Sequence, residues 1–124
     1  PGELPHKRAS GALAEEYECA LIMDGLAEVE TWVRNLDKRQ FWIPGHPHNA
    51  YPDFVAKLND GRILAVEYKG GDRVSNDDSK HKALMGKLWQ KTSGKKGVYL
   101  MAMAQSVHPQ RWSIEEQLKH ALAS

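Results

Sequence analysis

The chain of 124 residues contains a single cysteine, Cys19, so a disulfide framework within one chain is impossible. This composition fits a reducing, intracellular setting, and we expect a cytoplasmic protein. No apolar run approaches the roughly 20 residues needed to span a bilayer, and no signal-peptide pattern opens the chain. The sequence therefore predicts no membrane as a partner.

The chain also has no excess of charge of one sign. It contains 17 Lys and Arg and 16 Asp and Glu, for a net charge of +1. This balance neither indicates nor excludes nucleic acid as a partner, since local patches matter more than totals. Internal repeats and a glycine-rich phosphate loop are missing too, so we expect no ATP site in this chain. Its hydrophobic fraction of 41% is typical of a folded domain.

The chain divides into a short leading segment and one domain. Residues 1–11 are rich in proline, glycine and charge and predict a linker or a disordered segment. Residues 12–124 predict a single domain. Because the first residue is proline rather than methionine, we expect this domain to be a piece of a larger protein.

Apolar periodicity and turn residues predict eight elements in this domain. Gly25 predicts the end of the first helix, and Ser113 with Glu116 forms a capping box before the last one. The order α-β-β-β-β-α-β-α indicates an α/β fold in which helices flank a mixed sheet. Helices are expected over 12–26, 78–92 and 113–123, and strands over 28–35, 41–43, the two arms of 51–71, and 97–105.

The stretch YPDFVAKLNDGRILAVEYKGG, residues 51–71, predicts a β-hairpin with an Asn59-Asp60-Gly61 loop. With Gly61 in the left-handed conformation, opposed residues have numbers that sum to 120. Asp53 then lies opposite Glu67, with Lys69 on the same face. A two-residue loop of Asp60 and Gly61 would instead shift the register by one and separate these groups.

The same register predicts an apolar face and a mixed face for the hairpin. The apolar face would hold Phe54, Ala56, Leu58, Leu64, Val66 and Tyr68, and the mixed face Asp53, Val55, Lys57, Ile63, Ala65, Glu67 and Lys69.

Two opposed carboxylates repel each other, so their pairing requires a compensating positive charge. A divalent cation such as Mg²⁺ would provide it, and Lys69 could then position or deprotonate an attacking water. The alternative is a structural salt-bridge cluster in which Lys69 neutralises Asp53 and Glu67.

At these residues the chain resembles the PD-(D/E)XK nuclease superfamily, through Pro52-Asp53 and then Glu67-Tyr68-Lys69. It looks most like the C-terminal endonuclease domain of type III restriction enzymes and related DEAD-box helicase fusions. The similarity spans roughly residues 15–104. Besides the hairpin, TWVRNLDKRQFWIP at 31–44 and KHKALMGKLWQKTSGKKGVYLMA at 80–102 carry it.

This resemblance implies an αβββαβ core and Mg²⁺-dependent cleavage of DNA, with Mn²⁺ able to substitute. By position, Asp53 and Glu67 would bind the metal, the Tyr68 backbone carbonyl would be a further ligand, and Lys69 would be the catalytic lysine.

Such nucleases often add a glutamate from the first helix to the site. Spacing from the Val-Arg-Asn segment favours Glu16 and leaves Glu15 and Glu18 open. One departure from the family is His46-Pro47-His48, which stands where a tyrosine and glycine-rich approach is common. Two histidines without a second ligand pair do not predict zinc.

Lysines of the second predicted helix are candidates for DNA contact. Lys80, Lys87 and Lys91 share one stripe at helical spacing and could lie on phosphates or on a solvated face. Lys82 lies off that stripe, but the family resemblance points to it as a site residue. The neighbouring apolar face would hold Leu84, Met85, Leu88 and Trp89.

The remaining candidates favour structural roles. Trp32, Trp42, Trp89 and Trp112 could stack on bases, but core packing is the more common role of tryptophan. Cys19, in the middle of a helix, predicts a buried thiol rather than a nucleophile.

We therefore expect a metal-dependent DNA endonuclease domain, the cleavage domain of a type III restriction enzyme or helicase-nuclease. Its partners would be DNA and other domains or subunits of that parent, and a double-strand cut would ask for a dimer. RNA or branched DNA is a further possible substrate. The alternative is a non-catalytic module that binds nucleic acid or protein and uses the acid and lysine cluster structurally.

Overall fold

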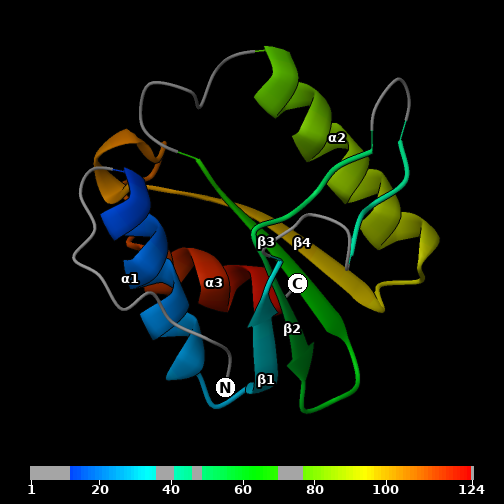
Figure 1. The fold of residues 1–124 in the computed structure, drawn as a ribbon, viewed down its shortest axis with the longest axis horizontal. Coiled ribbons are helices and arrows are strands. Elements are labelled where there is room, and N and C mark those ends of the chain that lie inside the picture. The colour runs from blue at the N-terminus through cyan, green and yellow to red at the C-terminus, as the bar shows by residue number, and fades with distance from the viewer. Residues whose placement is uncertain (1–11, 36–40, 46–48, 70–76, 124) are drawn as a thin grey trace.

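The computed structural model describes residues 12–35, 41–45, 49–69 and 77–123. It is an α/β fold in which helices flank a four-stranded mixed sheet (Figure 1). No helix in the described part of the chain is long and apolar enough to cross a membrane. The elements are α1 Ala12–Asp24, β1 Val29–Arg34, β2 Phe54–Leu58, β3 Ile63–Lys69, α2 Asp77–Thr92, β4 Gly97–Met103, the 3-10 turn η2 Gln105–Val107 and α3 Ile114–Ala123.

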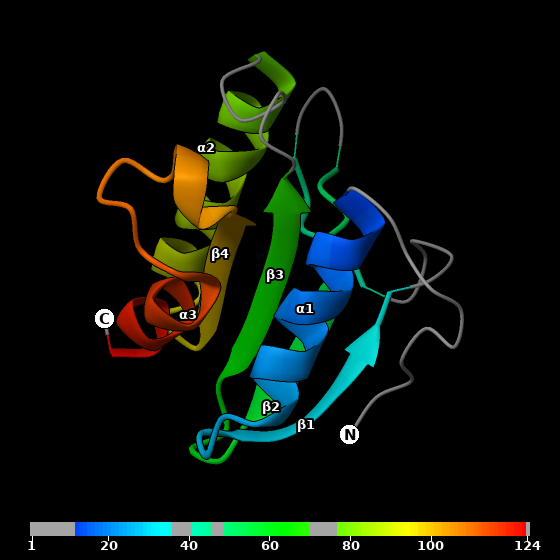
Figure 2. The ribbon, with the colours of Figure 1, turned by 90° about the vertical axis from the view of Figure 1, so that its left-hand side faces the viewer.

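The sheet has the strand order β1-β2-β3-β4. β1, β2 and β3 pair antiparallel, and β4 pairs parallel to β3 after the crossover through α2. α1 and α3 lie on one face, in front of the strands in Figure 2, and α2 lies on the other. Both faces are therefore covered, which explains why β4 is a continuous apolar run rather than an alternating one.

The hairpin has the three-residue loop and the register expected from its sequence. Gly61 has φ of 93°, a conformation that glycine adopts without a steric penalty. Phe54 faces Val66 and Lys57 faces Ile63, so opposed numbers sum to 120. All six residues of the predicted apolar face are buried against α1 and α3, as that register requires: Phe54, Ala56, Leu58, Leu64, Val66 and Tyr68.

The expected strand over residues 41–43 is wrong. Ile43 makes only an isolated antiparallel bridge with Ala50, through a hydrogen bond in each direction. The run is too short to form a ladder, and Pro44 follows at once, with no N–H to donate. Its apolar residues serve the core instead, because Ile43 is buried and Phe41 packs edge-on against Trp89. Among the described residues, three strands, not four, therefore precede α2.

The predicted apolar face of α2 is wrong in half of its residues. Met85 is buried and Trp89 is partly buried, but Leu84 and Leu88 are 67% and 60% exposed. The helix turns Gly86 toward the sheet, where a Cβ would lie 2.2 Å from the Tyr99 ring. Apolar periodicity cannot register this contact, because the residue that permits it has no side chain.

Candidate active site

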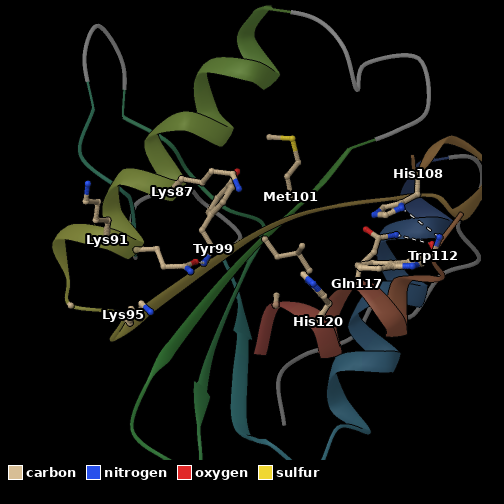
Figure 3. Close-up of a pocket in the computed structure, with 13 residues that line it drawn as sticks. Lys87, Lys91, Lys95, Tyr99, Met101, His108, Trp112, Gln117 and His120 are labelled. Atoms are coloured by element: carbon tan, nitrogen blue, oxygen red, sulfur yellow. Dashed lines mark hydrogen bonds between the residues drawn. The ribbon is translucent and has the colours of Figure 1, made fainter. Parts of the chain in front are cut away.

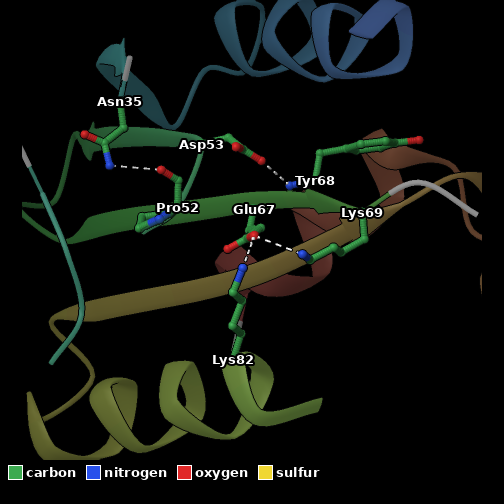
Figure 4. A network of polar contacts seen from close by, with 7 residues as sticks. All are labelled: Asn35, Pro52, Asp53, Glu67, Tyr68, Lys69 and Lys82. Carbon is green, nitrogen blue, oxygen red and sulfur yellow. Dashed lines mark hydrogen bonds and ion pairs between the residues drawn. The ribbon is translucent and has the colours of Figure 1, made fainter. Parts of the chain in front are cut away.

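Asp53 is held at the end of the sheet by its own backbone and by Asn35. Its N–H donates to the Val66 carbonyl at 2.9 Å, and its carbonyl accepts from the Asn35 N–H at 2.8 Å. The buried Asn35 side chain also donates to the Pro52 carbonyl at 3.0 Å (Figure 4). The Asp53 carboxylate then accepts the Tyr68 backbone N–H at 2.8 Å, which fixes its orientation beside β3.

Glu67 is the buried carboxylate of the site. The β2–β3 ladder ends at Phe54 and Val66, and the Asp53 backbone just beyond it bonds Val66, the neighbour of Glu67. Its side chain is only 7% exposed, and its Oε2 lies 3.2 Å from both the Lys69 Nζ and the Lys82 Nζ. Its Oε1 is buried without a hydrogen-bond partner. One oxygen is thus neutralised by two ammonium groups, and the other is left to accept a donor or a cation.

Tyr99 shows that both carboxylates act on one small region. Its pKa is raised, first by burial and then by the negative charges of Glu67 and Asp53. Tyr99 belongs to the cluster that α2 covers, whereas the Asp53 charge also acts on Cys19 on the opposite face of the sheet. Asp53 thus lies at the end of the sheet, where its charge reaches both faces.

Glu16 of α1, the first-helix candidate for the site, is paired with an arginine of β1. Its Oε1 forms an ion pair of 2.6 Å with the Arg34 guanidinium, and both side chains are largely buried. Its charge also acts on Cys19, whose pKa is raised to about 12 by burial and then by Asp53, Glu16 and Glu18. Glu16 and Asp53 thus both act on Cys19, and the Arg34 guanidinium holds the Glu16 carboxylate.

The two other first-helix glutamates give no stronger candidate. Glu18 is exposed, and the Glu15 side chain lies outside the described part of the structure. Cys19 itself is completely buried, as its place in the helix predicted.

The lysines of α2 divide into one that enters the site and three that do not. Lys82 extends from α2 to Glu67 and is 24% exposed. Lys80, Lys87 and Lys91 are exposed on the helix, as their common stripe predicted. The structure therefore places Lys82, and none of the stripe lysines, against the carboxylates.

The carboxylates are the groups of this site that could hold a metal. No group of three or more His, Cys, Asp or Glu among the described residues forms a metal site. Asp53 and Glu67 give two carboxylates, and Mg²⁺ commonly binds proteins through one or two carboxylates with water completing its shell. The unpartnered Glu67 Oε1 fits such an ion. His46 and His48 lie outside the described residues.

Asn35 and Arg34 are positioning residues to which sequence reasoning assigned no role. Asn35 clamps the Pro52-Asp53 backbone, and Arg34 holds Glu16 and lies over the Phe54 ring at 5.8 Å. Both belong to the Trp-Val-Arg-Asn segment, which had been singled out only for its resemblance. A buried asparagine that follows a strand is the signal that could have identified the clamp, because such amides usually bind backbone groups.

Comparisons with protein-family models, with curated proteins and with solved structures found no match to this chain.

Proposed function

We propose that the chain is a metal-dependent DNA endonuclease domain of the PD-(D/E)XK type, from a type III restriction enzyme or a helicase-nuclease. The observation that carries the proposal is Glu67, a buried carboxylate with one oxygen on two lysines and the other without a partner. A fold selected for stability alone has no need of this group under a helix. Asp53, whose carboxylate accepts the N–H of Tyr68 next to Glu67, would supply the second carboxylate.

Asp53 and Glu67 would hold Mg²⁺ or Mn²⁺, with the Tyr68 carbonyl as a third candidate ligand. When bound, such an ion supplies Lewis-acid stabilisation of the phosphate and lowers the pKa of a water. The chain's own contribution is to fix the ligands before substrate arrives. The Tyr68 N–H orients Asp53, and Asn35 fixes the backbone that carries it.

Lys69 and Lys82 would act on the substrate rather than on the fold. Their ammonium groups meet at the same Glu67 oxygen, which restrains both without exposing them fully to water. Two positive charges held there can stabilise the negative charge that develops on a phosphate during hydrolysis. Lys69, only 12% exposed, would also orient the attacking water through its ammonium group.

The proposal is tested by nicking of supercoiled plasmid in Mg²⁺ or Mn²⁺. We expect the domain to nick the plasmid, EDTA to stop it, and Lys69→Ala to slow it about 10²-fold or more. Lys57→Ala is the matched control, because Lys57 is an exposed lysine of the same hairpin and should leave nicking unchanged. Equal nicking by Lys69→Ala would attribute the activity to a contaminant and contradict the assigned site.

One observation favours the non-catalytic alternative. Both lysines lie on a single Glu67 oxygen, which is also how a structural charge cluster neutralises itself. A binding module of this kind would hold DNA in EDTA and would hold it equally well with Lys69→Ala. DNA binding with that behaviour and no nicking in either metal would support the alternative over the nuclease.

A further inference from the structure

A second concave surface lies beside the acid cluster, at the edge of the sheet. A cavity of about 690 Å³ opens between the C-terminal half of α2 and α3, with the edge strand β4 as its floor (Figure 3). We call it the β4 groove. Its two walls carry different side chains, with Lys87, Lys91 and Lys95 on one and His108, Trp112 and His120 on the other.

The lysine wall makes the β4 groove locally cationic. Lys87, Lys91 and Lys95 are exposed, and no aspartate or glutamate occurs among the described residues that line the groove. The whole chain has a net charge of only +1, so this excess belongs to the groove and not to the composition. The groove is therefore complementary to an anionic occupant.

The opposite wall is an aromatic platform. The His108 and Trp112 rings stack at 5.2 Å with 18° between their planes, and Trp112 lies 4.7 Å from His120. Hydrogen bonds hold this wall in place. The Trp112 backbone N–H donates to the His108 Nδ1, and the Gln117 side-chain amide donates to the Trp112 backbone carbonyl. The indole thus lies between two imidazoles, and an unpaired base can join this stack at the exposed His120.

The floor of the groove argues against an added peptide strand. Outward-facing N–H groups of β4 already have side-chain partners, since the Tyr99 N–H donates to Gln90 and the Met103 N–H to Gln117. The Gln117 amide also donates to the Met103 carbonyl at 2.7 Å. Addition of a β-strand requires a free row of backbone groups, and Gln90 and Gln117 interrupt that row on both sides of Met101.

The groove also adjoins the acid cluster directly. Met101, which lines the groove, is the ladder partner of Glu67. Tyr99 also lines the groove, and the negative charges of Glu67 and Asp53 help to raise its pKa. A strand lying in the groove would therefore pass next to the carboxylates.

We propose that the β4 groove holds a segment of single-stranded nucleic acid, with Lys87, Lys91 and Lys95 on its phosphates and a base added to the ring stack that Trp112 centres. The inference rests on the proposed function in one respect, since the strand would be the one that continues into the acid cluster. Binding in the groove itself needs neither metal nor cleavage.

The test is the anisotropy of a fluorescein-labelled single-stranded 20-mer in EDTA, titrated with wild type and variants over a range of salt. Lys91→Glu/Lys95→Glu should weaken binding at least tenfold and reduce the slope of log K against log salt by about 1.4, because two phosphate contacts are lost. Trp112→Ala should weaken it about fivefold or more, whereas Trp112→Phe, which keeps an aromatic ring, should retain most of the affinity.

Lys57→Glu is the control, an exposed lysine outside the groove whose reversal changes the charge by half as much as the double variant does. Equal weakening by Lys57→Glu, or unchanged binding by the groove variants, would overturn the proposal. A labelled poly-glutamate peptide that binds as tightly as the 20-mer, with the same dependence on Lys91 and Lys95, would assign the groove to acidic peptides instead.

The outcomes separate this inference from the nuclease proposal. Groove-dependent binding without plasmid nicking would leave the groove assignment intact and reject the nuclease. Nicking that needs Lys69, together with normal binding in every groove variant, would support the nuclease and reject the groove assignment.

Discussion

The two faces of the β2–β3 hairpin are both covered by helices but are built from different chemistry. One face packs Phe54 and Leu64 against α1 and α3 without a charged group. The other buries Glu67 under α2 with two lysine ammonium groups. The same strands, with the same alternation, could have been apolar on both sides. The first face is accounted for by stability alone, whereas the second is what the proposed catalysis would require.

The largest loss of stability should come from a substitution in the apolar face. Phe54→Ala removes a fully buried ring that packs edge-on against Trp32, and should lower the free energy of unfolding by about 3–5 kcal/mol. Val55→Ala, the next residue on the other face and only partly buried, should cost less than about 2 kcal/mol. Urea unfolding followed by tryptophan fluorescence measures both, and equal losses would contradict the division into two faces.

The division between the faces could be predicted from sequence because it depends on local chemistry. Asn59-Asp60-Gly61 selects the loop, the loop fixes the register, and the register assigns each side chain to a face. The predicted register gave Asp53 and Glu67 neighbouring positions for this reason, without any knowledge of tertiary contacts. The capping box of α3 followed from the same kind of rule, with the Ser113 hydroxyl accepting the Glu116 N–H.

Apart from the short run at 41–43, what sequence reasoning missed depends on contacts between distant segments. The rotation of α2 follows from the Tyr99 ring against Gly86, and Glu16 is held by Arg34 from another element. The β4 groove forms between α2 and α3, so no single stretch of sequence contains it. Such features arise from packing, which a one-dimensional periodicity does not encode.

A change in pH tests the apolar face by a different route. Burial, followed by the charges of Asp53, Glu16 and Glu18, raises the pKa of Cys19 to about 12. The unfolded thiol ionises near about 8.5, so the folded state keeps a proton that the unfolded chain releases. Stability is therefore full below pH 8.5 and falls as pH rises toward 12, by about 2 kcal/mol between pH 8 and pH 10.

The comparison with Cys19→Ala isolates this effect, because lysines and tyrosines titrate equally in both proteins. Urea midpoints at pH 8 and pH 10 should fall further in the wild type than in Cys19→Ala. An identical fall in both would show that the thiol is ionised in the folded state and that this part of the core admits water.

The change in stability caused by substitutions in the charged face should depend on which charges are removed. It should be smallest when all three are removed together. Glu67→Gln leaves Lys69 and Lys82 together without their counter-charge and should cost about 1–3 kcal/mol. Glu67→Leu/Lys69→Met/Lys82→Met removes all three charges and keeps similar volume, so it should unfold at or above the wild-type urea concentration. A triple variant less stable than Glu67→Gln would mean that the cluster holds the fold together. That result would favour the structural alternative, whereas a stable triple variant would leave catalysis as the reason that these charges are buried.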